Sequence, residues 1–320
     1  MGVFVFLPLV LPLTAWPVAR LAEQRLHPRT ATRLLAAVAG VSAVCSTLCL
    51  GLLMIVGTAQ LPGNPLPDSW SDPDVRAALP YDEIAGRAAI PALLAVLVSC
   101  GAAARRQRRV RRRAVAALGG LPPRSVAVLP DRTPYAYALP GGRGCGPGRG
   151  RGPGRIVVST GMLTGLASAE RRALFAHERA HLAGRHHRHL LTVHLAARAN
   201  PFLRPLRTAV SYTAERWADE EAAAEVGSRR SVARAIGRAA LLAPRAPAAG
   251  LPALTGAGPV PRRVAALMRP APAGRAWPPV GTAVGLAAWG AAFGVTVSAL
   301  SSANSAVTLF LVLRGVAPPV

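Results

Sequence analysis

The sequence has no lysine and is poor in aromatic and acidic residues. Aromatic residues make up 5% of the 320 positions, and 14 acidic residues stand against 38 arginines, which gives a formal net charge of +24. A nucleic-acid interface would need basic residues gathered on a folded face or interleaved with stacking aromatic side chains. Many arginines instead flank apolar runs, so we expect no direct contact with nucleic acid.

Cysteine is scarce as well, and its four positions form no metal-binding or disulfide pattern. Cys45, Cys49 and Cys100 lie inside apolar runs, and Cys145 lies in a glycine-rich segment. Paired metal-ligand spacings and an extracellular disulfide framework are both missing. We therefore expect packing roles for Cys45 and Cys49 and an unpaired, inert thiol at Cys145.

Long apolar runs, in contrast, are plentiful and predict membrane spans. Residues 34–59 contain no charge over 26 positions, enough to cross a hydrocarbon core of about 30 Å. Residues 3–19 and 88–104 form two further runs, and 276–320 contain another, interrupted by serines and an asparagine. The sequence thus predicts an α-helical integral membrane protein with about four spans in contact with membrane lipid. The last segment could be one span or a span with a shorter second piece.

Charges between these runs predict the orientation. Arginines cluster in residues 20–33 and 105–113, whereas residues 60–83 are acidic and rich in proline. Basic loops stay on the cytoplasmic side of a membrane. We therefore expect a multi-pass protein of the cell membrane, with residues 60–83 facing outward and residues 105–275 in the cytoplasm.

The block 105–275 is predicted to be an α+β domain. Three short extended runs, at 125–129, 135–139 and 155–160, indicate a small sheet. The glycine- and arginine-rich segment 140–155 cannot bury enough apolar surface to order itself and is predicted to be a flexible loop.

Helical patterns follow these runs. Ser168 is a plausible N-cap for a helix that reaches about Arg185, and a second helix is expected from near Thr213 to Gly227.

The first helix carries the sequence His177-Glu178-Arg179-Ala180-His181. Two histidines at i and i+4 lie on one helical face, so both imidazoles can reach one metal ion. Glu178 beside them can act as general base toward an attacking water molecule and pass the proton to a leaving amine. The pattern predicts a metallopeptidase with zinc as its cofactor.

A catalytic zinc site needs a third protein ligand. Glu215, 34 residues beyond His181, fits this role on the second predicted helix, and Asp219 one turn later can hydrogen-bond a ligand histidine from behind. Alternatively, both are ordinary carboxylates on an acidic, solvated helix face.

The order of these segments resembles a peptidase family. The runs PYAYAL, IVVSTGML, SAERRALFAHERAHLAGRHH and AERWADEEAA resemble the gluzincin membrane peptidases, namely the BlaR/MecR antirepressor family and its relatives of the HtpX and CAAX-prenyl protease type. The likeness covers about residues 122–230. It implies a zincin-like fold, zinc, and Glu215 as the third ligand. Three spans before the domain and one after it favour the BlaR/MecR branch.

The resemblance also implies a substrate. It indicates regulated cleavage of a cytoplasmic protein, typically a winged-helix repressor, in signal transduction. Only a few residues follow the last apolar run, so we expect no penicillin-binding sensor domain. An HtpX-like protease for membrane-protein quality control and a non-catalytic signalling pseudopeptidase are the alternatives.

Other residues near the motif have competing interpretations. His187 completes a literal His-Glu-x-x-His-x-x-Gly-x-x-His pattern and could replace Glu215 as third ligand. The simpler reading places His186, His187 and His189 on a basic, solvated helix end. Tyr135 and Tyr137 fall where the resemblance puts an edge strand that pairs with substrate, although core packing is equally compatible. Tyr212 is a candidate for stabilising the oxyanion.

Overall fold

The computed structural model describes residues 7–59, 82–122, 124–141, 154–242, 260–272 and 281–313. The described part is mostly helical, with one small sheet. Its α-helices are α1 (Leu7–Val10), α2 (Ala15–Arg25), α3 (Pro28–Ala59), α5 (Asp82–Ala116), α6 (Thr160–Gly165), α7 (Ser168–Ala183), α8 (His186–Ala199), α9 (Arg204–Val226), α10 (Arg229–Leu242), α11 (Val260–Leu267) and α12 (Ala283–Leu313). Its 3-10 helices are η2 (Leu11–Thr14) and η4 (Pro201–Leu203), and its strands are β1 (Val126–Leu129), β2 (Ala136–Leu139) and β3 (Arg155–Ser159).

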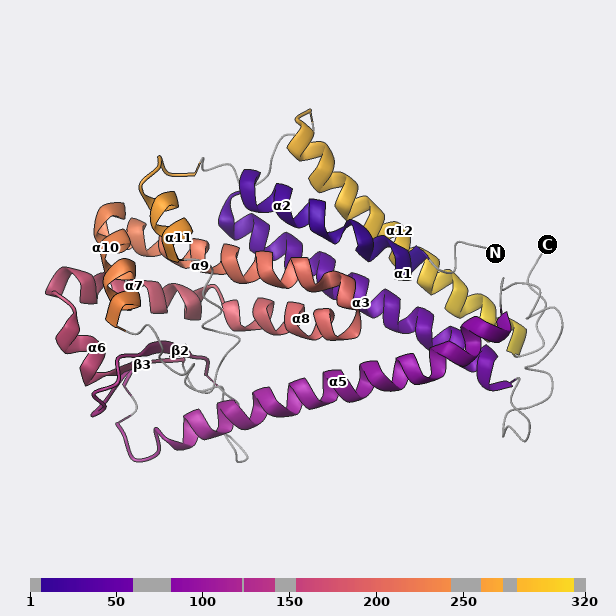
Figure 1. Cartoon of the computed structure of the whole chain (residues 1–320), viewed down its shortest axis with the longest axis horizontal. Coiled ribbons are helices and arrows are strands. Elements are labelled where there is room, and N and C mark those ends of the chain that lie inside the picture. The colour runs from indigo at the N-terminus through magenta and orange to yellow at the C-terminus, as the bar shows by residue number, and fades with distance from the viewer. Residues whose placement is uncertain are drawn as a thin grey trace.

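The molecule is elongated, with different structure at its two ends. The sheet and the short helices α6, α7, α10 and α11 lie at one end, and the long helices α3, α5 and α12 extend to the other (Figure 1). Helices α8 and α9 lie between the two ends. The peptidase motif on α7 is therefore held at the end that carries the sheet.

Helices α3 and α5 are long and apolar enough to cross a membrane. The qualifying stretches are Pro28–Ile55 and Ile84–Ala116. They contain the runs 34–59 and 88–104 almost completely, so the two expected apolar helices are present. Length and composition alone are weak grounds for membrane insertion, because core helices of soluble proteins meet the same test. The expected outward loop lies outside the described residues, except for Asp82 and Glu83 at the start of α5.

The described part of the first apolar run, expected as a span at 3–19, does not form a single regular α-helix, and the span itself stays a prediction. Its described part is divided into α1, the 3-10 turn η2 and the beginning of α2. Pro8, Pro12 and Pro17 explain the interruptions, because proline lacks the N–H that an α-helix needs and clashes with the preceding turn. The C-terminal run, in contrast, forms the continuous 31-residue helix α12.

The sheet has the strand order β1-β3-β2, with β1 parallel and β2 antiparallel to β3. All three predicted strands are thus present, and β2 is an edge strand. One face of the sheet packs on the end of α5, where Leu118 contacts a core containing Tyr137 and Val157. Arg111 of α5 also donates hydrogen bonds to the carbonyls that follow β2, at Pro140 and Gly141. The apolar helix α5 is therefore joined directly to the edge strand.

The predicted helix boundaries are partly wrong. Helix α7 begins at Ser168, so the N-cap is Ala167, whose N–H donates to the Glu170 carboxylate. Helix α9 begins at Arg204, nine residues before the expected start. Its end is as predicted, because Gly227 adopts a left-handed conformation with φ of 74° that glycine accommodates without strain.

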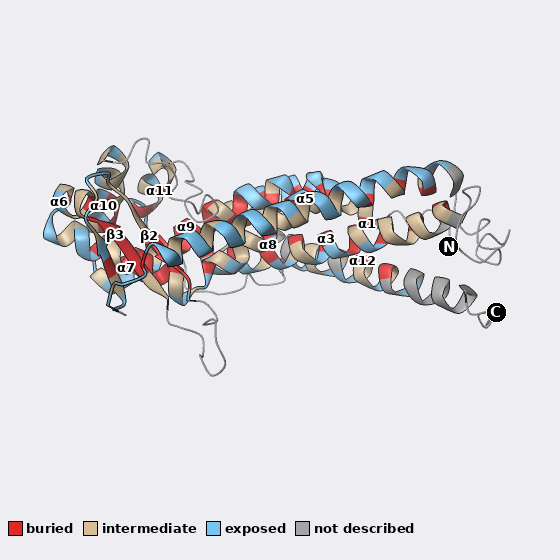
Figure 2. Ribbon diagram, turned by 90° about the horizontal axis from the view of Figure 1, so that it is seen from below, coloured by how far each residue is buried: buried red, intermediate tan, exposed pale blue. Residues whose placement is uncertain are grey.

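Helices α8 and α9 pack along α3 and form the main core with it. Buried alanines and leucines of α3 interlock with those of α8 and α9, and Figure 2 shows buried residues where these helices meet. Two buried polar contacts fix the register. Thr32 Oγ1 donates to Thr213 Oγ1 at 3.0 Å, and Asn200 Nδ2 donates to Ser46 Oγ at 3.0 Å. The helix that carries Glu215 is thus anchored on an apolar candidate span.

Helices α3 and α5 approach most closely at two glycines. A Cβ atom on Gly57 would overlap the backbone of Gly86, and a Cβ on Gly86 would overlap that of Gly57. Both residues are buried. Small residues allow two helix backbones to meet at such a crossing.

This crossing predicts that substitutions at two glycines of the same helix, Gly57 and Gly51, have very different effects on stability. Gly57→Leu should force α3 and α5 apart and destabilise the protein by about 1–3 kcal/mol, the usual range for overpacking. Gly51→Leu is the matched control, because a Cβ there meets nothing within 4 Å. Thermal unfolding of the detergent-solubilised variants measures both effects. Equal melting temperatures for the two variants would show that the crossing is not tight.

Candidate metal centre

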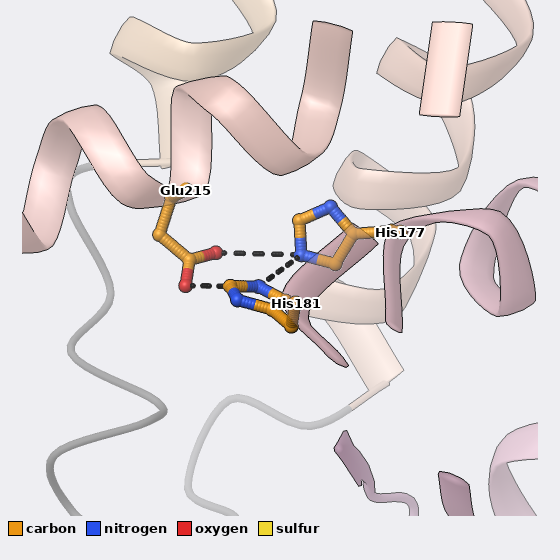
Figure 3. Close-up of side chains that lie close together, drawn as sticks. All are labelled: His177, His181 and Glu215. Atoms are coloured by element: carbon orange, nitrogen blue, oxygen red, sulfur yellow. Dashed lines mark hydrogen bonds and ion pairs between the residues drawn. The ribbon is translucent and has the colours of Figure 1, made fainter. Parts of the chain in front are cut away.

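Two neighbouring helices bring His177, His181 and Glu215 together. The histidines project from α7 and Glu215 projects from α9 toward them (Figure 3). The Nε2 atoms of the histidines are 3.1 Å apart, and the Glu215 carboxylate oxygens lie 3.5 Å from His177 Nε2 and 3.4 Å from His181 Nε2. Among the described residues, these three form the group of side chains that could share one metal ion.

The spacing of these donor atoms fits a zinc ion. Ligand atoms that each lie about 2.0–2.1 Å from one tetrahedral zinc are roughly 3.3–3.4 Å apart. The separation of the two imidazole nitrogens is close to this value, and each of them lies near a different oxygen of the Glu215 carboxylate. The donors are two imidazole nitrogens and a carboxylate oxygen, a set used by catalytic zinc sites, which leave a fourth position open. The geometry and the chemistry of the site therefore both suit zinc.

Each histidine is also held at its second ring nitrogen. His177 Nδ1 lies 3.1 Å from Asp219 Oδ1, and His181 Nδ1 lies 2.8 Å from His186 Nδ1. Such partners fix the orientation of a ligand histidine and leave Nε2 free for the metal. Asp219 thus lies against the His177 ring, on the nitrogen that does not face Glu215. His186 is an additional contact.

Arg263 of α11 completes the polar cluster from the opposite side. Its guanidinium donates to Asp219 through Nε at 2.9 Å and Nη2 at 2.6 Å, and Nη1 lies 2.8 Å from Glu215 Oε2. All three side chains are buried. Because a buried carboxylate without a positive partner is costly, Arg263 stabilises both acidic groups in their ionised form.

The charges on the two carboxylates follow from these contacts. Burial raises the pKa of Glu215, but Arg263 and His181 outweigh it and hold the pKa far below its usual value. Burial likewise raises the pKa of Asp219, and Arg263 and His177 together lower it below its usual value. Both groups are therefore anionic at neutral pH, as a metal ligand and its supporting group need to be.

The two ligand histidines differ in charge when no metal is bound. Burial lowers the pKa of His177, but the carboxylates of Asp219 and Glu215 outweigh it and raise the pKa to about 10. Burial dominates at His181 and lowers its pKa to about 4. A metal ligand must be a neutral imidazole, so metal binding would displace a proton from His177.

Glu178 lies beside the ligands and faces the edge strand. Burial raises the pKa of its carboxyl to about 7, while the positive charge of His177 and a hydrogen bond with the backbone of Ala138 in β2 act in the opposite direction. A pKa near the working pH suits a group that both accepts and returns a proton. The contact with Ala138 places this group next to the free edge of the sheet.

The structure separates His187 from this cluster. Helix α7 ends at Ala183, Arg185 takes a left-handed conformation with φ of 50°, and His187 lies in the first turn of α8. It is not among the grouped ligand atoms of the described residues. His186 also corrects an expectation, because it is completely buried against His181 and Trp217 instead of lying on a solvated helix end.

The tyrosines take structural positions. Tyr212 is buried, with the Arg262 guanidinium 4.0 Å from the centre of its ring. Tyr137 is buried in the core between the sheet and α5, and Tyr135 stacks against it at 6.2 Å. Core packing therefore accounts for Tyr137, although the strand that carries it is an edge strand as expected.

Sequence reasoning missed Arg263 and His186. Arg263 lies far from the motif in an arginine-rich chain, so its own sequence context carries no signal. An indirect signal existed. If Glu215 and Asp219, one helical turn apart, are both buried, a positively charged side chain must lie close to them. The contact of His186 with His181 could have been predicted from the short link between α7 and α8, because this link keeps His186 close to the end of α7.

The comparison with known families agrees with this geometry. Residues 102–198 match the family model described as Peptidase family M48. Members of that family are zinc metallopeptidases, so the match supports a metallopeptidase. The matched range contains His177, Glu178 and His181 and ends before Glu215, whose place in the site rests on the structure. No curated protein and no solved structure matches the chain.

The ligand geometry predicts which side chains zinc binding requires. Glu215→Ala should remove one of three ligands and abolish stoichiometric zinc binding, whereas His187→Ala should retain it. Metal content of the purified full-length variants, measured by mass spectrometry after dialysis, distinguishes the two. The opposite pattern would establish His187 as the third ligand.

The raised pKa of Glu178 predicts a pH-dependent effect on stability. Its carboxyl has a pKa of about 7 in the folded protein, above the ordinary value of 4.5, so the folded protein binds the proton more tightly. Relative to Glu178→Gln, the metal-free wild type should therefore lose stability as pH rises from about 4.5 to 7. The difference should reach on the order of 3 kcal/mol at pH 8.

Thermal unfolding in the presence of a chelator at pH 5 and pH 8 measures this difference. Glu225→Gln is the control, because Glu225 is half-exposed and pairs with Arg179. A gap between wild type and Glu178→Gln that does not widen between these pH values would contradict the burial of an ionisable Glu178.

Proposed function

We propose that the chain is a membrane-bound zinc metalloendopeptidase that hydrolyses peptide bonds of a cytoplasmic protein. The observation that carries the proposal is the juxtaposition of three zinc-compatible ligand atoms with the buried carboxyl of Glu178. The match to Peptidase family M48 over the same helix supports it. Apolar helices α3 and α5 support the membrane location by their length and composition.

The residues of the site divide the chemistry between them. His177, His181 and Glu215 would hold the zinc ion. A bound zinc ion supplies Lewis acidity, which lowers the pKa of water and polarises a carbonyl oxygen. Asp219 and His186 orient the two imidazoles, and Arg263 keeps Glu215 and Asp219 ionised.

Glu178 moves the proton. Its carboxylate accepts a proton from the attacking water molecule as the water oxygen bonds to the scissile carbonyl carbon. It then donates this proton to the nitrogen of the leaving amine as the carbon–nitrogen bond breaks. The products are a new carboxyl terminus and a new amino terminus, and Glu178 returns to its starting form.

The edge strand β2 offers a way to align the substrate. Within the described part of the chain it is paired on one side only, with β3, and its Ala138 contacts Glu178. An extended peptide can add to such an edge through main-chain hydrogen bonds, which bind the backbone with little demand on side chains. Substrate choice would then depend on access to an extended segment.

The identity of the substrate can be proposed from the sequence resemblance. We propose a cytoplasmic transcriptional repressor of the winged-helix type, cleaved in signal transduction. The alternative is an unfolded membrane protein. Incubating the purified enzyme with both substrate types, and mapping the products by mass spectrometry, distinguishes site-specific cleavage of one folded regulator from broad cleavage of unfolded chains.

The general-base role predicts a separation of zinc binding from catalysis. Glu178→Gln should keep stoichiometric zinc, because Glu178 is not a ligand, and should lower the hydrolysis rate by a factor of at least about 100, the low end for acid–base catalysis. Self-cleavage or cleavage of a casein-type substrate by the zinc-loaded enzyme measures the rate.

Two outcomes of this experiment decide between the candidate functions. Equal hydrolysis by wild type and Glu178→Gln would remove Glu178 from the mechanism. Zinc binding by the wild type without hydrolysis of any tested protein or peptide would favour a signalling pseudopeptidase.

A further inference from the structure

One face of α3 is exposed and apolar over four turns. Its residues recur at the spacing of a single helical face, and the largest of them, Val44 and Leu48, are 59% and 48% exposed. The stripe consists of Arg33, Ala37, Val41, Val44 and Leu48. It extends for about 22 Å at 1.5 Å per residue, with its single charge at one end. The stripe is therefore charged at the end that carries Arg33 and apolar from Ala37 to Leu48.

The stripe is the floor of a groove of about 550 Å³. Helix α8 forms one wall through His189 and Thr192, and helix α12 forms the other through Ala299 and Ser302. The groove lies outside the metal centre and shares no residue with it. Nothing in the proposed hydrolysis uses this space.

The end of the groove that contains Arg33 is positively charged. Arg33 lies there beside His189, whose pKa is lowered by burial and by the nearby charges of Arg33 and Arg188. The Arg33 guanidinium lies 5.2 Å from the centre of the Trp217 ring. Within the described ranges, Arg33 forms no ion pair with a carboxylate. This end of the groove therefore offers one cation without an anionic partner, beside the imidazole of His189.

The wall formed by α12 contains an unsatisfied polar atom. Ser302 is 4% exposed, and its hydroxyl has no hydrogen-bond partner in the described structure. A buried hydroxyl without a partner carries a free-energy cost, which a ligand in the groove could remove. The unsatisfied hydroxyl lies on the wall formed by α12, and Arg33 lies on the floor of the same groove.

We propose that this groove binds an anionic phospholipid, with the phosphate held by Arg33 and His189 and one acyl chain lying along the exposed stripe of α3. Arg33 immediately precedes the uncharged part of α3, which is the level of lipid headgroups in a membrane span. A small soluble anion would leave the apolar floor uncovered, and a purely apolar ligand would leave Arg33 unpaired. The site rests on the membrane location proposed above and is independent of the peptidase activity.

Lipid binding to the full-length protein tests this site. The protein in mixed micelles is titrated with phosphatidylglycerol or phosphatidylcholine of equal chain length, and bound lipid is counted by native mass spectrometry. We expect a preference for phosphatidylglycerol. Arg33→Gln should reduce that preference about fivefold, since one basic residue at a membrane surface contributes about 1 kcal/mol. His189→Ala should also weaken it.

Two further variants separate the headgroup from the acyl chain. Val44→Trp fills the groove at an exposed position and should reduce binding of both lipids. Arg230→Gln removes the same charge from an exposed position on α10 and should change nothing. Circular dichroism and zinc content confirm that each variant is folded.

Several results would overturn the proposal. Wild type that binds both lipids equally, or Arg33→Gln that matches Arg230→Gln, would remove the headgroup site. Glycerol phosphate that competes as well as the lipid would indicate a site for a small anion. Val44→Trp that leaves lipid binding intact but converts a dimer to a monomer would show that a second copy of the chain covers the groove.

Discussion

The metal centre depends on one interaction, the pairing of Arg263 with the buried carboxylates of Glu215 and Asp219. Two anionic groups one helical turn apart repel each other, and burial amplifies this repulsion by removing water. Arg263 contacts both and cancels part of their charge. Without a metal, protonated His177 balances the other negative charge, and a divalent cation would take over that role as it displaces the proton. Helix α11, although short and distant in sequence, therefore supports the candidate centre through Arg263.

Much of the site could be read from the sequence because it depends on local periodicity. The i and i+4 spacing placed His177 and His181 on one face of α7 and put Asp219 behind Glu215 on α9, and the structure brings these groups together. Short extended runs, the first of them alternating around valines, predicted all three strands for the same reason. Each of these features follows from the geometry of one helix or one strand, and the local sequence is enough to predict that geometry.

The remainder depends on contacts between distant elements, and these leave no local pattern. Arg263 is one arginine among many, and only the folded chain shows which carboxylates it reaches. The start of α9 was missed because Arg204 and Pro205 resemble a loop, although proline is well tolerated in the first turn of a helix. The first apolar run was predicted from hydrophobicity, whereas its prolines determine its shape. The resemblance to the BlaR/MecR branch is likewise not tested by the match to Peptidase family M48, which supports the broader class.

The edge strand β2 joins the two ends of the molecule. It contacts Glu178 on one side of the sheet, and the core around Tyr137 packs it on α5. Helix α5 is continuous from Asp82 to Ala116, with its one internal proline, Pro91, near the apolar end, so a tilt of the segment that follows Pro91 would be transmitted to the strand. The alignment of an extended peptide and the position of an apolar helix are thus mechanically linked.

Arg263 also determines the order in which the chain can complete its metal centre. During synthesis His177, Glu215 and Asp219 leave the ribosome before α11, so the two carboxylates first meet without their arginine. A chain truncated before Val260 would therefore contain the proposed metal ligands but lack the arginine that stabilises Glu215 and Asp219 in their ionised form.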